Sequence, residues 1–272
     1  MRTRMFSRGM IALGVAAIAG LGLTSTRALA QDKATELAKK TQNPVADLVT
    51  VPFQFNWNSG GGLGDRTYFL LNVQPVLPIK VSPKWNLISR TIVPLANYPG
   101  PAGTRFGGFG DIQEQLYFTP AKAGGLIWGL GPMFSFPTAT SAPLETGTWA
   151  MGVGGVVIKM TGPWVIGALA QQYWPVADDG GDPETNLFVT QPFINYNFGK
   201  GWALATAPII TANWDGPDDE QWTVPVGIGI SRTTVFNKRP ITLGMQYYHN
   251  AERPSGGPEN QVRIVFNLLY PD

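Results

Sequence analysis

Few side chains in this 272-residue chain are of types that do covalent chemistry. The absence of cysteine excludes disulfides, thiolate metal sites, a cysteine nucleophile and a lipid-modified N-terminal cysteine. The single histidine, His249, would be needed for hydrolysis by a Ser–His pair. No spacing selects a nucleophile among the candidate serines, which are Ser59, Ser135, Ser141 and Ser255. We therefore predict no catalytic residue and keep a hydrolase using His249 as an alternative.

Two acidic runs, DDGGDPE (178–184) and DGPDDE (215–220), supply carboxylate and carbonyl oxygens of the kind that bind divalent cations. Neither has the spacing of an EF-hand loop, so a solvated acidic rim is the simpler interpretation. The glycine-rich run GGGLGD (60–65) lacks the Lys and Ser or Thr of a phosphate-binding loop. We predict no metal, no cofactor and no nucleotide site.

The composition predicts the elements that position any site. Hydrophobic residues make up 44% of the chain and charged residues 14%, with 33 Gly and 23 Pro, which favours many short strands joined by turns. Glycine, proline and polar clusters bound twelve segments: 47–58, 66–79, 85–95, 111–119, 126–137, 149–159, 164–176, 185–198, 202–214, 221–235, 241–251 and 260–270. We predict one strand in each.

Alternation is clearest in the first segment, where Val49 and every second residue to Trp57 are apolar while Gln54 and Asn56 occupy the other parity. It recurs in the last segment, where Arg263 lies on the polar parity. Such strands have one apolar and one polar face. A soluble sandwich would show the same period, so alternation alone does not decide the fold.

The N-terminus resembles an export signal. Residues 1–30 place three arginines before a short apolar run and end in Ala28-Leu29-Ala30, a cleavage motif. We predict a signal peptide over 1–30, a periplasmic leader with a short helix over 31–46, and a barrel over 47–272. Cleavage would leave 16 basic and 18 acidic residues, which argues against nucleic acid as a partner. No later run is long enough for a spanning helix, so any membrane crossing requires a β-barrel.

The connections alternate in character. Every second one, including 96–110, is rich in Gly and Asp and carries most of the acids, whereas the others are mostly tight and basic. Outer-membrane barrels have long loops outside, short periplasmic turns and an even number of strands. The tryptophans fall at the predicted strand ends and would form two interfacial girdles: Trp57, Trp149, Trp174, Trp214 and Trp222 outside, and Trp85, Trp128, Trp164 and Trp202 inside. The predicted fold is all-β, a transmembrane antiparallel up-and-down β-barrel of about twelve strands.

Prolines inside the predicted strands argue against regular ladders, because proline donates no hydrogen bond. They are Pro52, Pro75, Pro78, Pro94, Pro132, Pro137, Pro192, Pro208 and Pro225. We interpret them as bulges or early strand ends, which leaves ten to fourteen strands open.

If the apolar parity faces lipid, the other parity lines the lumen. The lumen-lining candidates are Gln54, Asn56, Asn72, Gln74, Arg90, Gln113, Gln115, Gln191, Asn195, Asn197, Gln246 and Arg263. Amides solvate polar solutes without net charge, and the two arginines favour anions or aromatic faces. Glu114 has lipid-facing parity, where a carboxylate is costly, so we expect a bulge or a reversed facing in its strand.

Several stretches resemble a known family. They are TQNPVADLVTVPFQFNWN (41–58), DRTYFLLNVQPVLPIK (65–80), WNLISRTIVPL (85–95), GFGDIQ (108–113), GTWAMGVG (147–154) and VRIVFNLLYPD (262–272). These resemble proteins described as outer-membrane transporters associated with the meta-cleavage pathway of phenol degradation. The resemblance covers essentially the whole mature chain and implies an outer-membrane barrel that moves small organic compounds, aromatic ones among them. It supplies no functional residues.

These observations predict a bacterial outer-membrane channel or transporter, not an enzyme, through which small organic molecules pass passively. Its expected partners are outer-membrane lipid and lipopolysaccharide, the organic solute and the outer-membrane assembly machinery. The main alternative is a structural barrel whose lumen is filled and conducts nothing.

Overall fold

The computed structural model describes residues 34–61, 66–122, 124–141, 144, 147–178, 186–237 and 239–271. The predicted signal peptide lies outside the described residues. So do several acids of the predicted acidic loops, namely Asp65, Glu145, Asp179, Asp182 and Glu184.

The described residues form one antiparallel sheet. Its strands are β1 (Val49–Ser59), β2 (Tyr68–Val73), β3 (Val76–Lys80), β4 (Trp85–Pro99), β5 (Arg105–Phe109), β6 (Ile112–Pro120), β7 (Ile127–Phe136), β8 (Thr148–Thr161), β9 (Trp164–Asp178), β10 (Leu187–Gly199), β11 (Trp202–Thr206), β12 (Ile210–Asn213), β13 (Trp222–Phe236), β14 (Arg239–Glu252) and β15 (Asn260–Tyr270). Three strands of the barrel are each interrupted by a break and therefore carry two labels: β2 and β3, β5 and β6, and β11 and β12. The sheet therefore has twelve strands, as the sequence predicts.

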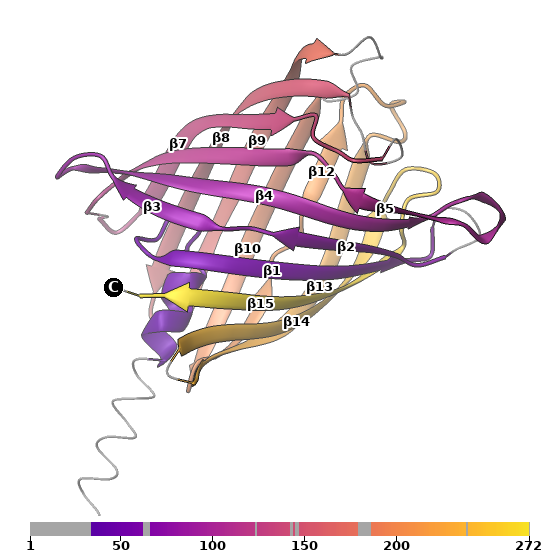
Figure 1. The fold of residues 1–272 in the computed structure, drawn as a ribbon. Helices are drawn as coiled ribbons and strands as arrows, with labels where there is room; N and C mark the ends of the chain where they lie inside the picture. The colour runs from indigo at the N-terminus through magenta and orange to yellow at the C-terminus, as the bar shows by residue number, and fades with distance from the viewer. Residues whose placement is uncertain are drawn as a thin grey trace, which may run out of the picture.

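The sheet closes on itself. The first strand pairs with the last along its whole length, from Val49 opposite Tyr270 to Ser59 opposite Asn260, and β9 pairs with β10. Each strand therefore has a partner on both sides, and Figure 1 shows the resulting barrel. Closure removes the unpaired sheet edges that a membrane would not tolerate.

The breaks coincide with prolines. Pro75 separates β2 from β3, Pro208 lies between β11 and β12, and the pairing of β13 with β14 shifts register next to Pro225. Pro94 and Pro132 lie inside β4 and β7, where the ladder is continuous on one side of the strand and interrupted on the other. The prolines thus interrupt or bulge strands without changing their number from twelve.

The predicted loop 96–110 is in part wrong. β4 continues to Pro99 and pairs with β5 from Leu95 opposite Phe109 to Pro99 opposite Arg105, with a 3-10 turn over Pro101–Gly103 between them. This hairpin projects beyond the barrel in Figure 1. Glycines in RFGGF weaken the strand signal of β5, although its backbone pairs regularly.

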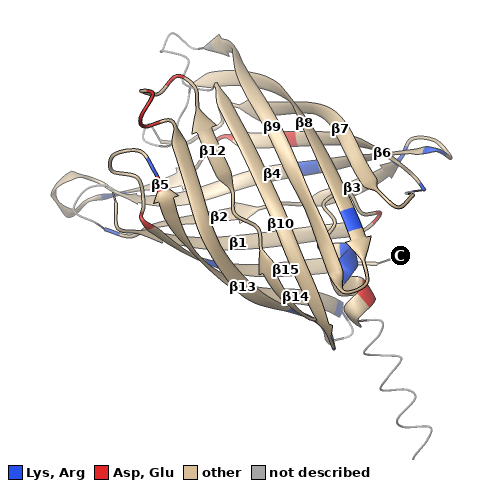
Figure 2. Ribbon diagram, turned by 180° about the vertical axis from the view of Figure 1, so that it is seen from behind, with Lys and Arg blue, Asp and Glu red and all other residues tan. Residues whose placement is uncertain are grey.

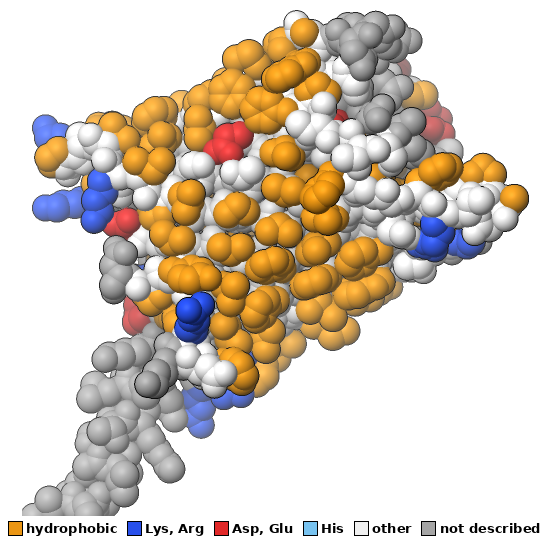
Figure 3. Space-filling model, in the orientation of Figure 1, with side chains coloured by type: hydrophobic (Ala, Val, Ile, Leu, Met, Phe, Trp, Pro, Cys, Tyr) orange, Lys and Arg blue, Asp and Glu red, His pale blue; other side chains and the backbone are white. Residues whose placement is uncertain are grey.

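The outer surface of the barrel is apolar. Large exposed side chains include Val226 at 62%, Leu130 at 60% and Val153 at 54% of their full exposure. Figure 3 shows such side chains covering the strands. A soluble protein rarely exposes so extensive an apolar surface, whereas a barrel in lipid requires it.

The two ends of the barrel differ. The loop between β12 and β13 carries Asp215, Asp218, Asp219 and Glu220, and Figure 2 shows acidic residues at that end. The other end holds a helix over residues 34–41 and the end of β15. Among the described residues, no helix is both long enough and apolar enough to span a membrane.

Glu114 is an acidic side chain on the outer face of the barrel. It pairs with Thr91 and Phe134, which lie on the opposite face from the lumen residues Arg90 and Gln115. The expected bulge or reversed facing is therefore wrong. Instead, the hydroxyls of Ser89 and Thr91 donate hydrogen bonds of 2.6 Å to its two carboxylate oxygens. Figure 3 shows an acidic group within the apolar surface.

We predict that these hydroxyls reduce the cost of the carboxylate. Because hydrogen bonds to a charged group contribute about 1.5–3 kcal/mol, the double variant Ser89→Ala/Thr91→Val should lower the free energy of unfolding in lipid by about 2 kcal/mol or more. In a Glu114→Leu background the same pair of changes should cost much less. Urea titration of the four proteins in vesicles measures the coupling, and equal losses in both backgrounds would contradict it.

Candidate solute site inside the barrel

Arg263 anchors the polar wall of the lumen. Neighbouring residues on paired antiparallel strands share a face, which brings Gln246, Arg263 and Asn56 together from β14, β15 and β1. The Nε of Arg263 donates to Asn56 Oδ1 at 3.0 Å, and one Nη donates to Gln261 Oε1 at 2.9 Å. The other Nη donates to Gln246 Oε1 at 3.4 Å and to the carbonyl of Ala207 at 3.2 Å.

The second lumen arginine has fewer partners. Arg90 on β4 donates to Gln74 Oε1 at 2.6 Å and to Gln115 Oε1 at 3.5 Å. Gln115 is oriented in turn by its Nε2 atom, which donates to Gln171 Oε1 at 3.2 Å and to Tyr173 Oη at 3.4 Å. Two neutral amide oxygens therefore hold Arg90 in place.

The lumen also has an apolar wall, on strands that carry inward polar residues as well. A buried cluster joins inward side chains of β3, β4 and β6 to β10: Val76, Ile88, Tyr117, Met133, Ala150, Val156, Ile158, Val165, Leu169, Tyr173 and Phe193. Val45 of the N-terminal segment belongs to the same cluster. Polar and apolar residues therefore share this part of the lumen, since Arg90 is two residues from Ile88 on β4 and Gln115 is two residues from Tyr117 on β6.

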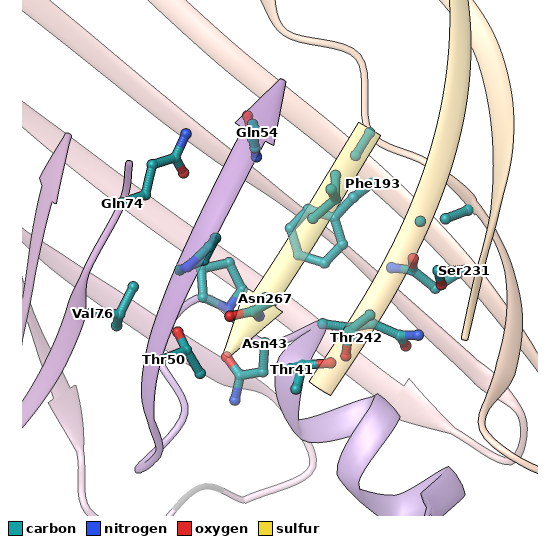
Figure 4. Close-up of a pocket in the computed structure, with 18 of the residues that line it drawn as sticks. Thr41, Asn43, Thr50, Gln54, Gln74, Val76, Phe193, Ser231, Thr242 and Asn267 are labelled. Carbon is teal, nitrogen blue, oxygen red and sulfur yellow. The ribbon is translucent and has the colours of Figure 1, made fainter. Parts of the chain in front are cut away.

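A cavity of about 210 Å³ is lined by residues of both kinds. They include the polar residues Gln54, Gln74 and Arg90 together with Leu169 and Phe193 from the apolar cluster. Figure 4 shows the amides of Gln54 and Gln74 and the ring of Phe193 around it. Such a lining fits a solute with both a polar and an apolar part.

The N-terminal segment closes one end of this cavity. Residues from Lys40 to Asn43 contribute to its lining, and Figure 4 shows Thr41 and Asn43 beside Thr50 of β1. The amides of Gln42 and Asn197 exchange two hydrogen bonds of 3.0 Å, which fasten the segment to β10. The segment therefore occupies lumen space that the strands alone would leave open.

The structure brings most of the predicted lumen residues together. Seven line the cavity: Gln54, Gln74, Arg90, Gln191, Asn195, Gln246 and Arg263. Asn56 and Gln115 contact the two arginines, and Asn197 binds Gln42. Asn72 and Gln113 share the inward face with Gln54 and Ile92 but do not line the cavity. Their role in contact with a solute remains a prediction.

The alternation pattern of the sequence did not predict the apolar wall. β8 reads TWAMGVGGVVIKMT, in which both parities are apolar or small, so no polar face marks its inward side. That loss of alternation was the available signal, because a strand that contacts lipid outside and a filled lumen inside is apolar on both faces. The glycines in β8 obscured it by weakening the strand pattern.

The predicted girdle residues lie at strand ends. Trp85 and Trp128 are in contact, with ring centroids 5.8 Å apart, near the turn between β6 and β7, and Trp214 and Trp222 are 5.6 Å apart near the acidic loop. Seven of the nine tryptophans are exposed, the exceptions being the partly buried Trp202 and Trp222. Their contact with lipid headgroups remains a prediction.

Among the described residues, no serine forms a Ser–His pair with His249. Its ring Nδ1 is 3.2 Å from Asn260 Oδ1, and Asn260 lies between His249 and Ser59 in the register of β14, β15 and β1. The backbones of His249 and Ser59 are therefore two strand spacings apart, about 10 Å. In the part of the chain that the structure describes, no hydrogen bond joins the side chain of His249 to a serine, as a Ser–His pair requires. Ser135 is buried, and Ser255 hydrogen-bonds to Glu220.

Among the described residues, no three His, Asp or Glu side chains form a group that could hold a metal ion.

The comparisons with known proteins bear on the fold. No family model matches the chain, and no curated protein matches it in sequence. It is similar to the crystal structure of an outer-membrane channel from Pseudomonas putida F1, with a TM-score of 0.62 and 14% identity over 82% of this chain and 94% of that one. The fold is that of an outer-membrane barrel. The chain is also similar to outer membrane phospholipase A from Escherichia coli, with a TM-score of 0.47 and 12% identity over 82% and 96% of the two chains. Membership of the phenol-pathway family stays a prediction.

Proposed function

We propose that the chain is a passive channel of the bacterial outer membrane for small organic molecules, aromatic ones among them. The observation that carries this proposal is the cavity inside a closed barrel, lined both by amides and by the apolar side chains of Leu169 and Phe193. The lining suits molecules with both polar and apolar parts. Transport through such a channel is downhill and needs no cofactor or catalytic residue.

The apolar outer surface and the segregated charges support a place in the outer membrane. We propose that the signal peptide is cleaved after Ala30 and that the assembly machinery then inserts the mature chain. In this orientation the acidic loops face outward, where divalent cations would bridge them to lipopolysaccharide, and the N-terminal segment faces the periplasm.

The channel is tested by refolding residues 31–272 and recording single-channel currents in a planar lipid bilayer. We expect discrete conductance steps that small aromatic solutes block more effectively than sugars do, because only the former match the apolar wall. A barrel that is folded, as judged by heat-modifiable migration on a gel, but never conducts would contradict the channel.

A non-conducting structural barrel is the second candidate. It is favoured by the apolar cluster and by the N-terminal segment, which together fill much of the lumen. The same recordings separate the two, since a filled lumen gives no conductance and no solute flux under any gradient. Hydrolysis that uses His249 is the weakest candidate. A rate of ester hydrolysis that His249→Ala leaves unchanged would remove it.

A further inference from the structure

Arg90 is a lumen cation that none of the described acids neutralises. Its guanidinium has five N–H donors, of which the amide oxygens of Gln74 and Gln115 accept two. No described carboxylate forms an ion pair with it. The side chain is partly accessible and borders the cavity. Its remaining donors are therefore available to a solute.

Arg263 differs in this respect. It is only 3% exposed, and its donors are directed to Asn56, Gln246, Gln261 and the carbonyl of Ala207. Its guanidinium also lies 5.0 Å from the ring centroid of Tyr248. These contacts give Arg263 a structural role in the wall and leave Arg90 as the arginine that is open to a ligand.

The residues that line the cavity carry a net positive charge. Arg90, Arg263 and Lys40 are among the residues that line it, and no Asp or Glu is among them. A water-poor cleft with charges of one sign concentrates ions of the opposite sign. A buried charge is costly unless it is paired, so an anion that reaches Arg90 is stabilised there.

The apolar residues of the lining restrict the rest of that anion. Leu169 and Phe193 belong to the buried cluster and face the same cavity as Arg90. Its volume of about 210 Å³ lies below the roughly 300–1,000 Å³ of sites for drug-sized ligands. The space therefore suits a compound about the size of a single ring with one charged group.

We propose that the cavity is a binding site for small organic carboxylates. The carboxylate accepts hydrogen bonds from the free N–H groups of Arg90, whose planar fork matches its geometry. The apolar body packs against Leu169 and Phe193. Only the role of this site in transport rests on the proposed channel, because binding at the site requires no conduction.

The test compares benzoate with benzamide, which has the same shape and no charge. Binding to the full mature protein in detergent is measured by isothermal titration, and flux of both compounds is measured in proteoliposomes. We expect Arg90→Gln to weaken benzoate binding at least about tenfold, because 1.4 kcal/mol corresponds to a factor of ten and a charged hydrogen bond contributes more than this. Binding of benzamide should change little, and Arg90→Lys should give an intermediate result.

The matched control is Arg232→Gln. Arg232 lies on the exposed face of β13, 5.1 Å from the ring centroid of Trp202, and should affect neither compound. If wild type binds benzoate and Arg90→Gln does not, the site is supported, even when the barrel never conducts. A barrel that never conducts would overturn only the channel. Equal binding of benzoate by wild type and Arg90→Gln, in a protein that still conducts ions, would overturn the site and leave the channel standing.

Discussion

We expect deletion of residues 34–46 to increase the single-channel conductance of the barrel several-fold. These residues include Lys40 to Asn43, which line the cavity, and Val45, which packs into the apolar cluster. Their removal widens the narrow part of the lumen while every strand remains. Single-channel recording of the two proteins under the same salt gradient measures the change. The deletion should also raise the flux of neutral solutes such as benzamide.

A control separates occupancy of the lumen from charge at its mouth. Glu36→Gln breaks the exposed pair between Glu36 and Lys39, whose charged atoms are 3.1 Å apart, and leaves the segment in place. Its conductance should equal that of the unaltered protein. The double variant Gln42→Ala/Asn197→Ala should give brief openings, because it removes the amide pair that fastens the segment. A deletion protein that folds and conducts no better than the full chain would contradict this role.

We expect replacement of Gly227 with Ala to destabilise the barrel strongly. A Cβ at this position would overlap the carbonyl oxygen of Tyr247 and come within 2.7 Å of the Tyr248 ring. Tyr248 is fully buried, and its hydroxyl accepts a hydrogen bond of 3.0 Å from the backbone N–H of Ala207, at the break between β11 and β12. Displacing its ring therefore disturbs the wall on both sides of β13. Overpacking of this kind costs about 1–3 kcal/mol and in some cases more.

Gly155→Ala is the matched control in β8. The nearest atom to an added Cβ there is Leu130 Cδ1 at 3.5 Å, an ordinary contact. Alanine should therefore be tolerated and should stabilise the strand slightly, because glycine loses more conformational freedom on folding. Urea titration of both variants in lipid vesicles compares them. Equal stability of the two proteins would show that the wall at Gly227 relaxes without cost.

Local patterns in the sequence were sufficient to predict about twelve strands. Alternation in segments such as 47–58 and 260–270 depends on which face each residue occupies, and that is fixed by the two-residue period of a strand. Alternating loop types then implied an up-and-down order. The prolines left the count open because a break at Pro75 or Pro208 is compatible with one strand or two. Pairing of both fragments with the same neighbours resolved it.

The residues that line the lumen could be predicted only in part, because alternation identifies an inward residue only where the two faces of a strand differ in polarity. Polar parity identified Gln54, Arg90 and Arg263 as inward residues, but inward apolar residues such as Leu169 leave no contrast with a lipid-facing side of the same strand. The hydroxyls that solvate Glu114 are on the adjacent strand, 23 and 25 residues away in sequence, and no local pattern specifies that register.

The sequence by itself determined the strands, their number within narrow limits, and which side of each polar strand faces inward. Only the tertiary structure decided which inward residues meet. Arg263 donates hydrogen bonds to four neighbours and Arg90 to only two, although both are arginines on a polar parity. The place of the N-terminal segment was likewise decided by its contact with Asn197, 155 residues away. Parity specifies a face, whereas contacts across a lumen depend on closure of the barrel, which brings distant strands together.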